Sequence, residues 1–444
     1  MMYLRSRQTG AAMLLFVLFF TFTTGVMMLA LAQSIYFDLS DYNRLLKSKQ
    51  AYLTTESLVE DMVYRHVFET FSVGSTESLS LGGATASATT TYDAVNDVFE
   101  INGQASLQGV VRKVEALLSV GAGSAFSYGL QAGTGGITLS NNSTIIGNVY
   151  ANGVVTGAGS AQVRGDLVSA GASGRVNTIT ATGTIYANTI DRINAGKDAH
   201  YNVQIGTNAQ NPVAGTRFTP VTVQPIASMP ISTTTITEWK NSIATYGTTI
   251  TAADPLCSSG TYTIDTSVTI GYLKVECNLD IKKTGSGITV TVNGPIWATG
   301  NISFTSGPTI RVASSLGRRS VQFIADKTTD HLNSSKVEVR NSTQFFGSGD
   351  YRSYVMLLSM NDSAKNGGSV KAIDVSQSAN GAVLVYSNDG LIDIGNGITL
   401  KEVTGYKINV AQNSTVRYES GLASLLFTSG PGGGYRLDDW RQLE

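Results

Sequence analysis

The chain has 444 residues, of which 42% are hydrophobic and only 14% are charged, and it contains 47 glycines. Its formal net charge of −1 leaves no basic footprint of the kind that nucleic-acid-binding proteins carry, so we exclude nucleic acid as a partner. Low charge with abundant glycine suits a β-rich repeat fold, and the length allows more than one structural unit.

The N-terminus carries a candidate membrane segment. Residues 1–10 form a short basic leader with Arg5 and Arg7, and residues 11–32 follow as 22 residues without a charge. This length is enough to span a bilayer as one helix. Because the two arginines precede the segment, we expect the N-terminus inside and the rest of the chain outside the cytoplasm. A cleaved secretory signal is the alternative, although the apolar run is longer than usual for such a signal.

A helical pattern continues from Gln33 to about Phe71, with apolar residues at spacings of three and four and no Gly or Pro. We therefore expect a transmembrane and stem helix over residues 11–72, the alternative being two helices with a kink near Ser40–Asp41. Residues 73–134 alternate in short runs, which predicts a small antiparallel sheet followed by a Gly/Ser-rich joint. The expected turns are Gly82-Gly83, Asn96-Asp97 and Asn102-Gly103.

Residues 135–194 divide into ten hexads in which the first place is Gly seven times and the third place is mostly aliphatic. The fifth place is small or aliphatic, so the third and fifth places point to the same side of a strand. Gly or Asn before each pair lets the backbone bend, and three sides of six residues close a coil of 18. The pattern predicts a single-strand parallel β-helix, a triangular solenoid of either handedness. A disordered linker, the alternative, has no reason to keep aliphatic residues in phase.

The phase is lost over residues 195–260, where scattered prolines predict a loop-rich insertion with a short helix at Thr237–Tyr246 and a buried Trp239. Alternating runs resume over residues 261–428 and predict that the β-helix continues. Residues 429–444 are expected to form a C-terminal cap, tail or final packed strand. The fold class is therefore mainly β, preceded by one long helix and a small antiparallel sheet.

Cys257 and Cys277 are the two cysteines, and they lie 20 positions apart, which is close to one coil. They could therefore face each other on neighbouring coils, and outside the cytoplasm we expect a disulfide between them. Two buried free thiols are the alternative.

Little in the sequence points to catalysis. The three histidines, His66, His200 and His331, are isolated, and the densest titratable group is Asp326, Asp330 and His331. That group lies in DKTTDHLNSS, which is typical of a polar turn, whereas polysaccharide-cleaving β-helix enzymes need clustered carboxylates or a basic residue in a groove. The repeats also lack the Asp-bearing nonapeptide that binds calcium in some β-helices. We predict no enzymatic activity, no cofactor and no metal.

Three stretches resemble known proteins. RQTGAAMLLFVLFF, from Arg7, resembles the start of type IV pilin-like proteins of the PilX type, and AYLTTESLVEDMVYRH at 51–66 resembles the continuation of their helix. The strand-rich C-terminal segment ending in DDWRQLE resembles the β-helical domain often fused to such N-termini, and the repeats resemble bactofilin-type polymer-forming coils. This resemblance implies leader processing between Gly10 and Ala11 and assembly with other pilin-like subunits.

Two positions depart from the pilin pattern. Major pilins carry Glu at the fifth position of the mature chain, where cleavage after Gly10 would place Leu15, and Ala11 replaces the usual aromatic first residue. The resemblance therefore implies a minor or tip subunit rather than a bulk filament subunit.

These observations predict a non-enzymatic minor pilin or a membrane-anchored structural or adhesive protein of the bacterial cell surface, single-pass, with an extracellular β-helix. The expected partners are the membrane, other pilin-like subunits and surface glycans. A surface protein that binds or cleaves polysaccharides is the first alternative, and a self-polymerising scaffold of the bactofilin type is the second.

Overall fold

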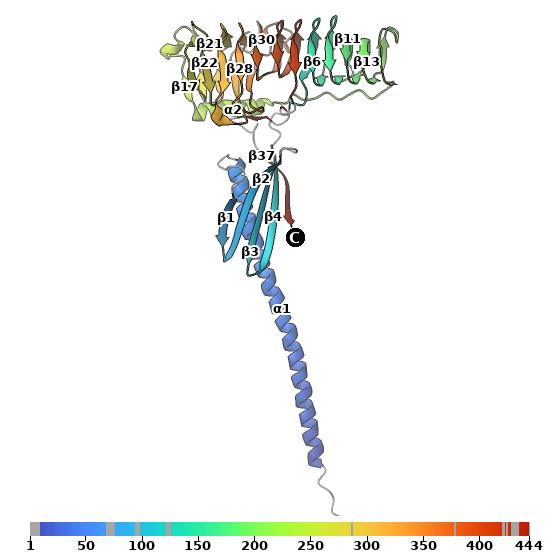
Figure 1. Cartoon of the computed structure of the whole chain (residues 1–444), viewed down its shortest axis with the longest axis vertical. Coiled ribbons are helices and arrows are strands. Elements are labelled where there is room, and N and C mark those ends of the chain that lie inside the picture. Colours follow the sequence, from blue (N-terminus) through green and yellow to red (C-terminus); the bar gives the residue numbers. More distant parts are fainter. Residues whose placement is uncertain are drawn as a thin grey trace, which may run out of the picture. The chain divides into compact units, whose positions relative to one another are not determined.

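The computed structural model of the chain divides into two compact units (Figure 1). The first comprises Met1–Ser119 with Tyr435–Glu444, and the second comprises Val120–Gly434. The second unit is therefore inserted into the first and has two chain connections to it. The structure describes residues 9–67, 76–93, 98–120, 126–285, 287–376, 379–419, 422, 425–427 and 435–443.

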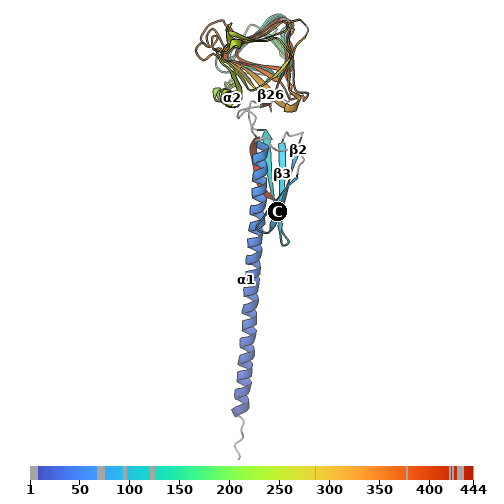
Figure 2. The same cartoon turned by 90° about the vertical axis from the view of Figure 1, so that its left-hand side faces the viewer.

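Helix α1 spans Thr9–Val67 as one helix of 59 residues (Figure 2), so the chain forms one helix here and not two. The expected boundary at residue 72 lies outside the described residues. In the apolar part, the hydroxyls of Thr21, Thr23 and Thr24 each donate to the carbonyl four residues earlier, at 2.9, 2.9 and 2.7 Å. These polar groups are thus satisfied within the helix and do not require water.

A five-stranded sheet, in the order β1-β2-β3-β4-β37, completes the first unit. Gly82-Gly83 forms an expected turn, and a second turn lies at Gln108-Gly109; both have two successive residues at positive φ, as in type I′ hairpins. The turn expected at Asn102-Gly103 is wrong because these residues lie inside β3, and Asn96-Asp97 falls outside the described residues. The strands are β1 Thr76–Leu81, β2 Ala84–Asp93, β3 Val98–Leu107, β4 Val110–Val120 and β37 Tyr435–Leu443.

Gly103 lets the helix approach the sheet closely. Helix α1 packs through Ala51, Leu58, Val59 and Met62 against buried side chains of β2, β3 and β4. A Cβ atom at Gly103 would lie only 2.4 Å from Cγ2 of Val59. The dipeptide that suggested a turn is therefore a place where a strand needs glycine for packing.

The C-terminal segment belongs to the first unit and does not cap the repeats. Strand β37 is the neighbour of β4, so of the cap, tail or final packed strand expected over residues 429–444 the structure shows a packed strand, in the small sheet. Trp440 packs against the core between α1 and the sheet. The alternation in this segment predicts a strand. Its partner strand lies more than 300 residues earlier in the chain, so local sequence patterns cannot identify that partner.

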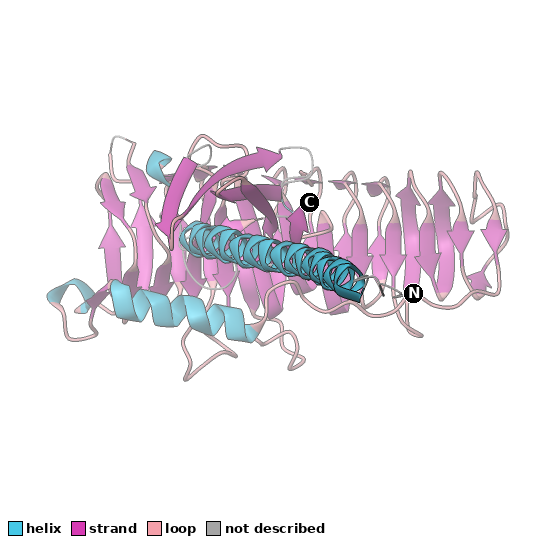
Figure 3. Ribbon diagram, turned by 90° about the horizontal axis from the view of Figure 1, so that it is seen from below, coloured by secondary structure: helices cyan, strands magenta, loops and turns pink. Residues whose placement is uncertain are grey.

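The second unit contains a parallel sheet of 32 strands, one α-helix and two 3-10 helices, as far as the structure describes it (Figure 3). The helices are α2 Thr233–Tyr246, η1 Pro255–Cys257 and η2 Ser314–Leu316. The strands of residues 130–218 are β5 Leu130–Leu139, β6 Thr144–Ile146, β7 Val149–Ala151, β8 Val155–Gly157, β9 Gln162–Arg164, β10 Leu167–Ser169, β11 Arg175–Ala181, β12 Ile185–Ala187, β13 Thr189–Ala195, β14 Ala199–His200, β15 Val203–Ile205 and β16 Arg217–Phe218. Those of residues 248–346 are β17 Thr248–Ile250, β18 Thr261–Ile264, β19 Val268–Ile270, β20 Leu273–Val275, β21 Asn278–Lys282, β22 Thr289–Val292, β23 Ile296–Ala298, β24 Ile302–Thr305, β25 Thr309–Val312, β26 Arg319–Ala325, β27 Val337–Val339 and β28 Gln344–Phe346. The remaining strands are β29 Val355–Ser359, β30 Lys371–Val375, β31 Asn380–Gly381, β32 Val383–Ile394, β33 Thr399–Leu400, β34 Glu402–Val410, β35 Thr415–Arg417 and β36 Leu426–Phe427.

The strands form three rows. From β17 to β29, each strand pairs in parallel with the strand three places later, so one row begins β17-β20-β23, the second β18-β21-β24 and the third β19-β22-β25. From β30 to β33 the partner is two places later, because the long strand β32 pairs with both β29 and β30. Inward side chains from all rows form one apolar cluster. Such stacking buries each strand's apolar side only against its neighbours, which is consistent with a β-helix.

The hexads predict which side chains face the core. Val149, Leu167 and Ile185, all third-place residues, are fully buried and pair with one another in register, 18 positions apart. The spacing then shortens, because Ile185 pairs with Ala199, only 14 positions later. The repeat therefore holds its length only over the first part of this segment.

The rows do not follow the order of the chain. Strand β34 pairs with β5, and β35 pairs with β6, so the strands of residues 130–218 continue the rows after those of residues 248–417. The chain thus enters the sheet in its middle at β5, runs to one end at β16 and resumes at the other end at β17. The expected insertion over 195–260 is correspondingly shorter, because β14, β15 and β16 still belong to the sheet.

Residues 219–247, here called the return segment, connect the two ends of the sheet. Outward side chains of the first row bind its peptide groups: Asn152 donates to the Ala227 carbonyl at 2.7 Å and accepts from the Ala227 amide at 2.9 Å. Tyr386 donates to the Ile231 carbonyl at 2.6 Å. Helix α2 then buries Trp239, as its sequence predicts. Hydrogen bonds thus hold the segment where it has no strands of its own.

Candidate functional sites

The apolar part of α1 is uncovered. Every large apolar side chain from Met13 to Leu46 is exposed, with Met13 at 73% and Leu46 at 47%. Its most apolar 18-residue window has a mean hydropathy of 2.3, and none of that window is buried. By length and composition this helix could cross a membrane.

The candidate processing residues lie at the start of this helix. Gly10 and Ala11 are in the first turn of α1, which begins at Thr9. Nothing in the backbone geometry tests cleavage between them, so leader processing stays a prediction. Leu15 lies on the exposed apolar surface, at 69% exposure.

An ion pair holds the C-terminal strand. Arg441 of β37 donates through Nε to Glu115 of β4, whose side chain is only 6% exposed. The hydrogen bond from Arg441 lowers the pKa of Glu115, whereas the hydrogen bond to Glu115, together with burial, raises the pKa of Glu100. As the pH falls, Glu100 takes up a proton first, and the Arg441–Glu115 link persists.

A polar groove of about 380 Å³ lies on the outer side of the second row, over β18, β21, β24 and β27. Within it, Asp280 Oδ1 accepts from Ser303 Oγ at 2.7 Å and from Thr305 Oγ1 at 3.1 Å. Lys336 and Glu338 complete a surface of alternating donors and acceptors. Because the residues of this groove come from different levels of the sheet, no local sequence motif predicts the groove.

The same row continues as a ladder of charges. Glu338, Asp374 and Asp393 pair in register on successive strands, about 4.8 Å apart. Arg340 lies 3.6 Å from Glu338 and 2.7 Å from Asp374, and Lys371 lies 3.4 Å from Asp374 and 2.6 Å from Asp393. Burial lowers the pKa of Lys371, but its carboxylate neighbours outweigh burial and raise it. The two cations thus offset the repulsion among three carboxylates.

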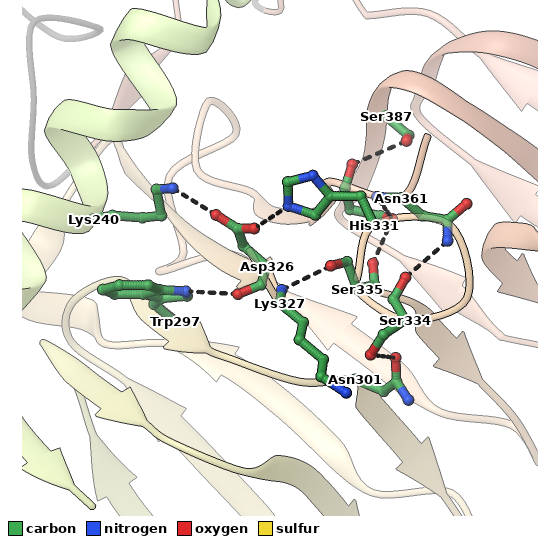
Figure 4. A network of polar contacts seen from close by, with 11 residues as sticks. Lys240, Trp297, Asn301, Asp326, Lys327, His331, Ser334, Ser335, Asn361 and Ser387 are labelled. Atoms are coloured by element: carbon green, nitrogen blue, oxygen red, sulfur yellow. Dashed lines mark hydrogen bonds and ion pairs between the residues drawn. The ribbon is translucent and has the colours of Figure 1, made fainter. Parts of the chain in front are cut away.

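The densest titratable group in the sequence becomes a contact between α2 and the sheet (Figure 4). Asp326 is 1% exposed; one of its oxygens accepts from Lys240 Nζ at 2.5 Å, and the other lies 2.7 Å from His331 Nε2. The indole of Trp297 donates to the backbone carbonyl of Asp326 at 3.4 Å. Both carboxylate oxygens are therefore occupied by neighbours within the protein.

Asp330, the third member of that group, lies apart from the other two. It accepts from the backbone amide of Asn333 at 3.0 Å and so caps its own turn. The third charged residue beside Asp326 and His331 is instead Lys240, which lies 86 positions before Asp326 in the chain. Its position beside Trp239 on a short amphipathic helix marks it as part of a packed element, but no signal in the sequence places it beside Asp326.

Cys257 and Cys277 form a disulfide, with their Cα atoms 6.0 Å apart. Cys257 ends η1, four positions before β18 begins, and Cys277 directly precedes β21, the strand that pairs with β18. The bond therefore ties the first two levels of the second row together. Formation of this bond in the cell stays a prediction.

A buried carboxyl lies between the first row and the layer outside it. Glu402 of β34 is fully buried, and its partner in register, Leu384, packs in the same cluster as Trp239. Thr404 donates to one oxygen of Glu402, and the other has no hydrogen-bond partner in the described part of the chain. Burial raises the pKa of Glu402 well above its usual range, because the low-dielectric surroundings disfavour the charged form of this carboxyl.

Comparison with known proteins places few limits on function. No family model matches the chain, and no curated protein matches it. The crystal structure of the competence-associated pilin ComZ from Thermus thermophilus matches 89% of this chain and 97% of its own, with 11% sequence identity and a TM-score of 0.29. A TM-score this low establishes no common fold, so the function must be inferred from the chain's own residues. Among the described residues, no cluster of three or more His, Cys, Asp or Glu could hold a metal ion.

Proposed function

We propose that the chain is a minor-pilin-like or membrane-anchored protein of the bacterial cell surface, with a structural or adhesive role and no reaction of its own. One observation carries this proposal: a single helix packs on the sheet through Ala51–Met62 while its apolar part, Met13–Leu46, is exposed. An apolar surface of this length needs a cover that water cannot provide. Either lipid or the stems of neighbouring subunits would supply it.

The second unit is, in this proposal, a triangular β-helix held outside the cytoplasm. Its three rows of parallel strands around one apolar core support that architecture. The Asp326–His331 pair supports a structural role, because its contacts join α2 to the sheet. Leader processing between Gly10 and Ala11, and relationship to PilX-type subunits, belong to the same proposal.

N-terminal sequencing of the full chain from fractionated cells tests the first part. A start at Ala11, with the protein in sheared surface filaments, supports a pilus subunit. A start at Met1, with the protein only in membranes, supports a permanent anchor. A start beyond Ala32 would mean an ordinary secretory signal, and the proposal would fail.

A second candidate is polysaccharide binding or cleavage. The groove beside Asp280 favours it, since carboxylate, amide, hydroxyl and amine groups line one open surface. A glycan panel separates the possibilities: release of reducing ends would show cleavage, and retention without release would show an adhesin. If Asp280→Ala leaves glycan retention unchanged, the groove is not the binding surface.

A further inference from the structure

Two open grooves separate α1 from the turn that joins β3 to β4. Their volumes are about 640 and 440 Å³. Arg44 of α1 lines both grooves, together with Gly109 of the turn and Val110 at the start of β4, and Lys47 lines the larger one. The turn thus lies beside a basic stretch of the helix.

The residues around these grooves carry excess positive charge. Within residues 38–49 and 108–113 there are five cations and two carboxylates, those of Asp38 and Asp41. Asp41 lines the smaller groove beside Arg44. Arg112 donates to Ser48 Oγ at 2.7 Å, whereas neither Arg44 nor Lys47 forms an ion pair with any residue that the structure describes. Two cations therefore remain available to a ligand.

The grooves begin where the uncharged part of the helix ends. No charge occurs from Ala11 to Phe37, a stretch of 27 residues. At 1.5 Å per residue it is about 40 Å long, close to the thickness of a bilayer with its headgroups. Tyr36, which lines the larger groove, is 71% exposed, and aromatic rings favour the membrane–water boundary. Val111, which lines the smaller groove, is 50% exposed.

We propose that Arg44 and Lys47, with the β3–β4 turn, form a docking surface for the anionic lipid headgroups of the bilayer that holds α1. The inference rests on the proposed membrane anchoring. The turn then lies in or just above the headgroup layer, within about one Debye length of the lipid charge. Cations at this height are attracted to anionic lipid, and the attraction holds the first unit against the membrane.

The test uses the full chain in nanodiscs of phosphatidylcholine alone or with phosphatidylglycerol. A fluorophore on Val111→Cys reports distance to a quencher attached to a small fraction of headgroups. We expect quenching about twofold stronger in anionic discs. High salt, or Arg44→Gln with Lys47→Gln, should reduce it to the neutral-disc level. Lys197→Gln with Lys407→Gln, which removes the same charge at exposed sites of the second unit, is the matched control and should leave quenching unchanged.

Equal quenching in neutral and anionic discs would overturn the inference while leaving the anchor intact, because the helix alone would then set the height of the turn. Unchanged quenching in the Arg44→Gln, Lys47→Gln chain would do the same. A chain that does not enter nanodiscs at all would instead refute the membrane anchoring on which the inference rests.

Discussion

The junction between β34 and β5 can be tested with two neighbouring substitutions. Ile137 of β5 is 2% exposed and pairs in register with Ile408 of β34 on one side and Val155 of β8 on the other. Ile137→Asp removes an apolar side chain, which costs about 2–5 kcal/mol in such cores. It also buries a carboxyl without a partner, which adds about 1–3 kcal/mol. We expect a total loss of stability of about 3–8 kcal/mol.

Hydrogen exchange locates this loss. Because β5 pairs with β34, the backbone amides of Glu402–Val410 should lose protection in Ile137→Asp, although they lie more than 260 positions away in the chain. Thr138→Asp is the matched control, since Thr138 is exposed and points outward, and it should change stability by less than about 0.5 kcal/mol. Equal destabilisation by both substitutions would refute the inward register. Full protection of Glu402–Val410 in Ile137→Asp would refute the pairing of β34 with β5.

Three further predictions concern single contacts. Gly103→Val should destabilise the first unit by about 1–3 kcal/mol through its clash with Val59, and Val59→Ala should restore much of the thermal stability; no restoration would contradict the close approach. The pKa of Glu402 is raised in the folded chain. Its contribution to the free energy of unfolding is therefore complete below about pH 4.5 and is lost as the pH rises. We therefore expect the free energy of unfolding of Glu402→Met, measured by urea titration, to rise relative to that of the natural chain from about pH 4 to pH 8. A difference in free energy that stays constant with pH would contradict this. Mass spectrometry of the unreduced protein should find Cys257 bonded to Cys277, with roughly 3 kcal/mol of stability lost when both become Ser; two alkylatable thiols would contradict the bond.

The sequence predicts inward and outward sides well because these depend on neighbours two positions apart. Leu167 is fully buried and Trp239 is fully buried, and both follow from local patterns. The Asn102-Gly103 turn fails because the same glycine serves a contact with Val59, on a helix more than 40 positions earlier. A turn signal and a packing signal are identical at the level of the dipeptide.

Pairing order could not be predicted, for a related reason. Every level of the sheet presents alternating inward apolar residues, so β34 would accept many strands as its next neighbour. The groove beside Asp280 and the contact of Lys240 with Asp326 depend on that order or on the path of the return segment. Sites built from residues of different levels are therefore visible only once the levels have been placed.

The permuted order has a physical reason in the way the second unit is inserted. Its first row contains 13 strands from β17 to β16, about 58 Å from end to end. Had the chain filled the rows in sequence order, its two ends would lie at opposite ends of that row. Yet they must return to β4 and β37, which are adjacent strands of one sheet. The intervening residues 121–125 and 428–434 number five and seven, and a fully extended chain of that combined length reaches about 43 Å. Entering and leaving the sheet in its middle removes the conflict: the amide of Phe126 donates to the carbonyl of Leu422 at 3.3 Å, so the incoming and outgoing chains are neighbours. This arrangement requires the return segment, whose loops and α2 connect one end of the sheet to the other.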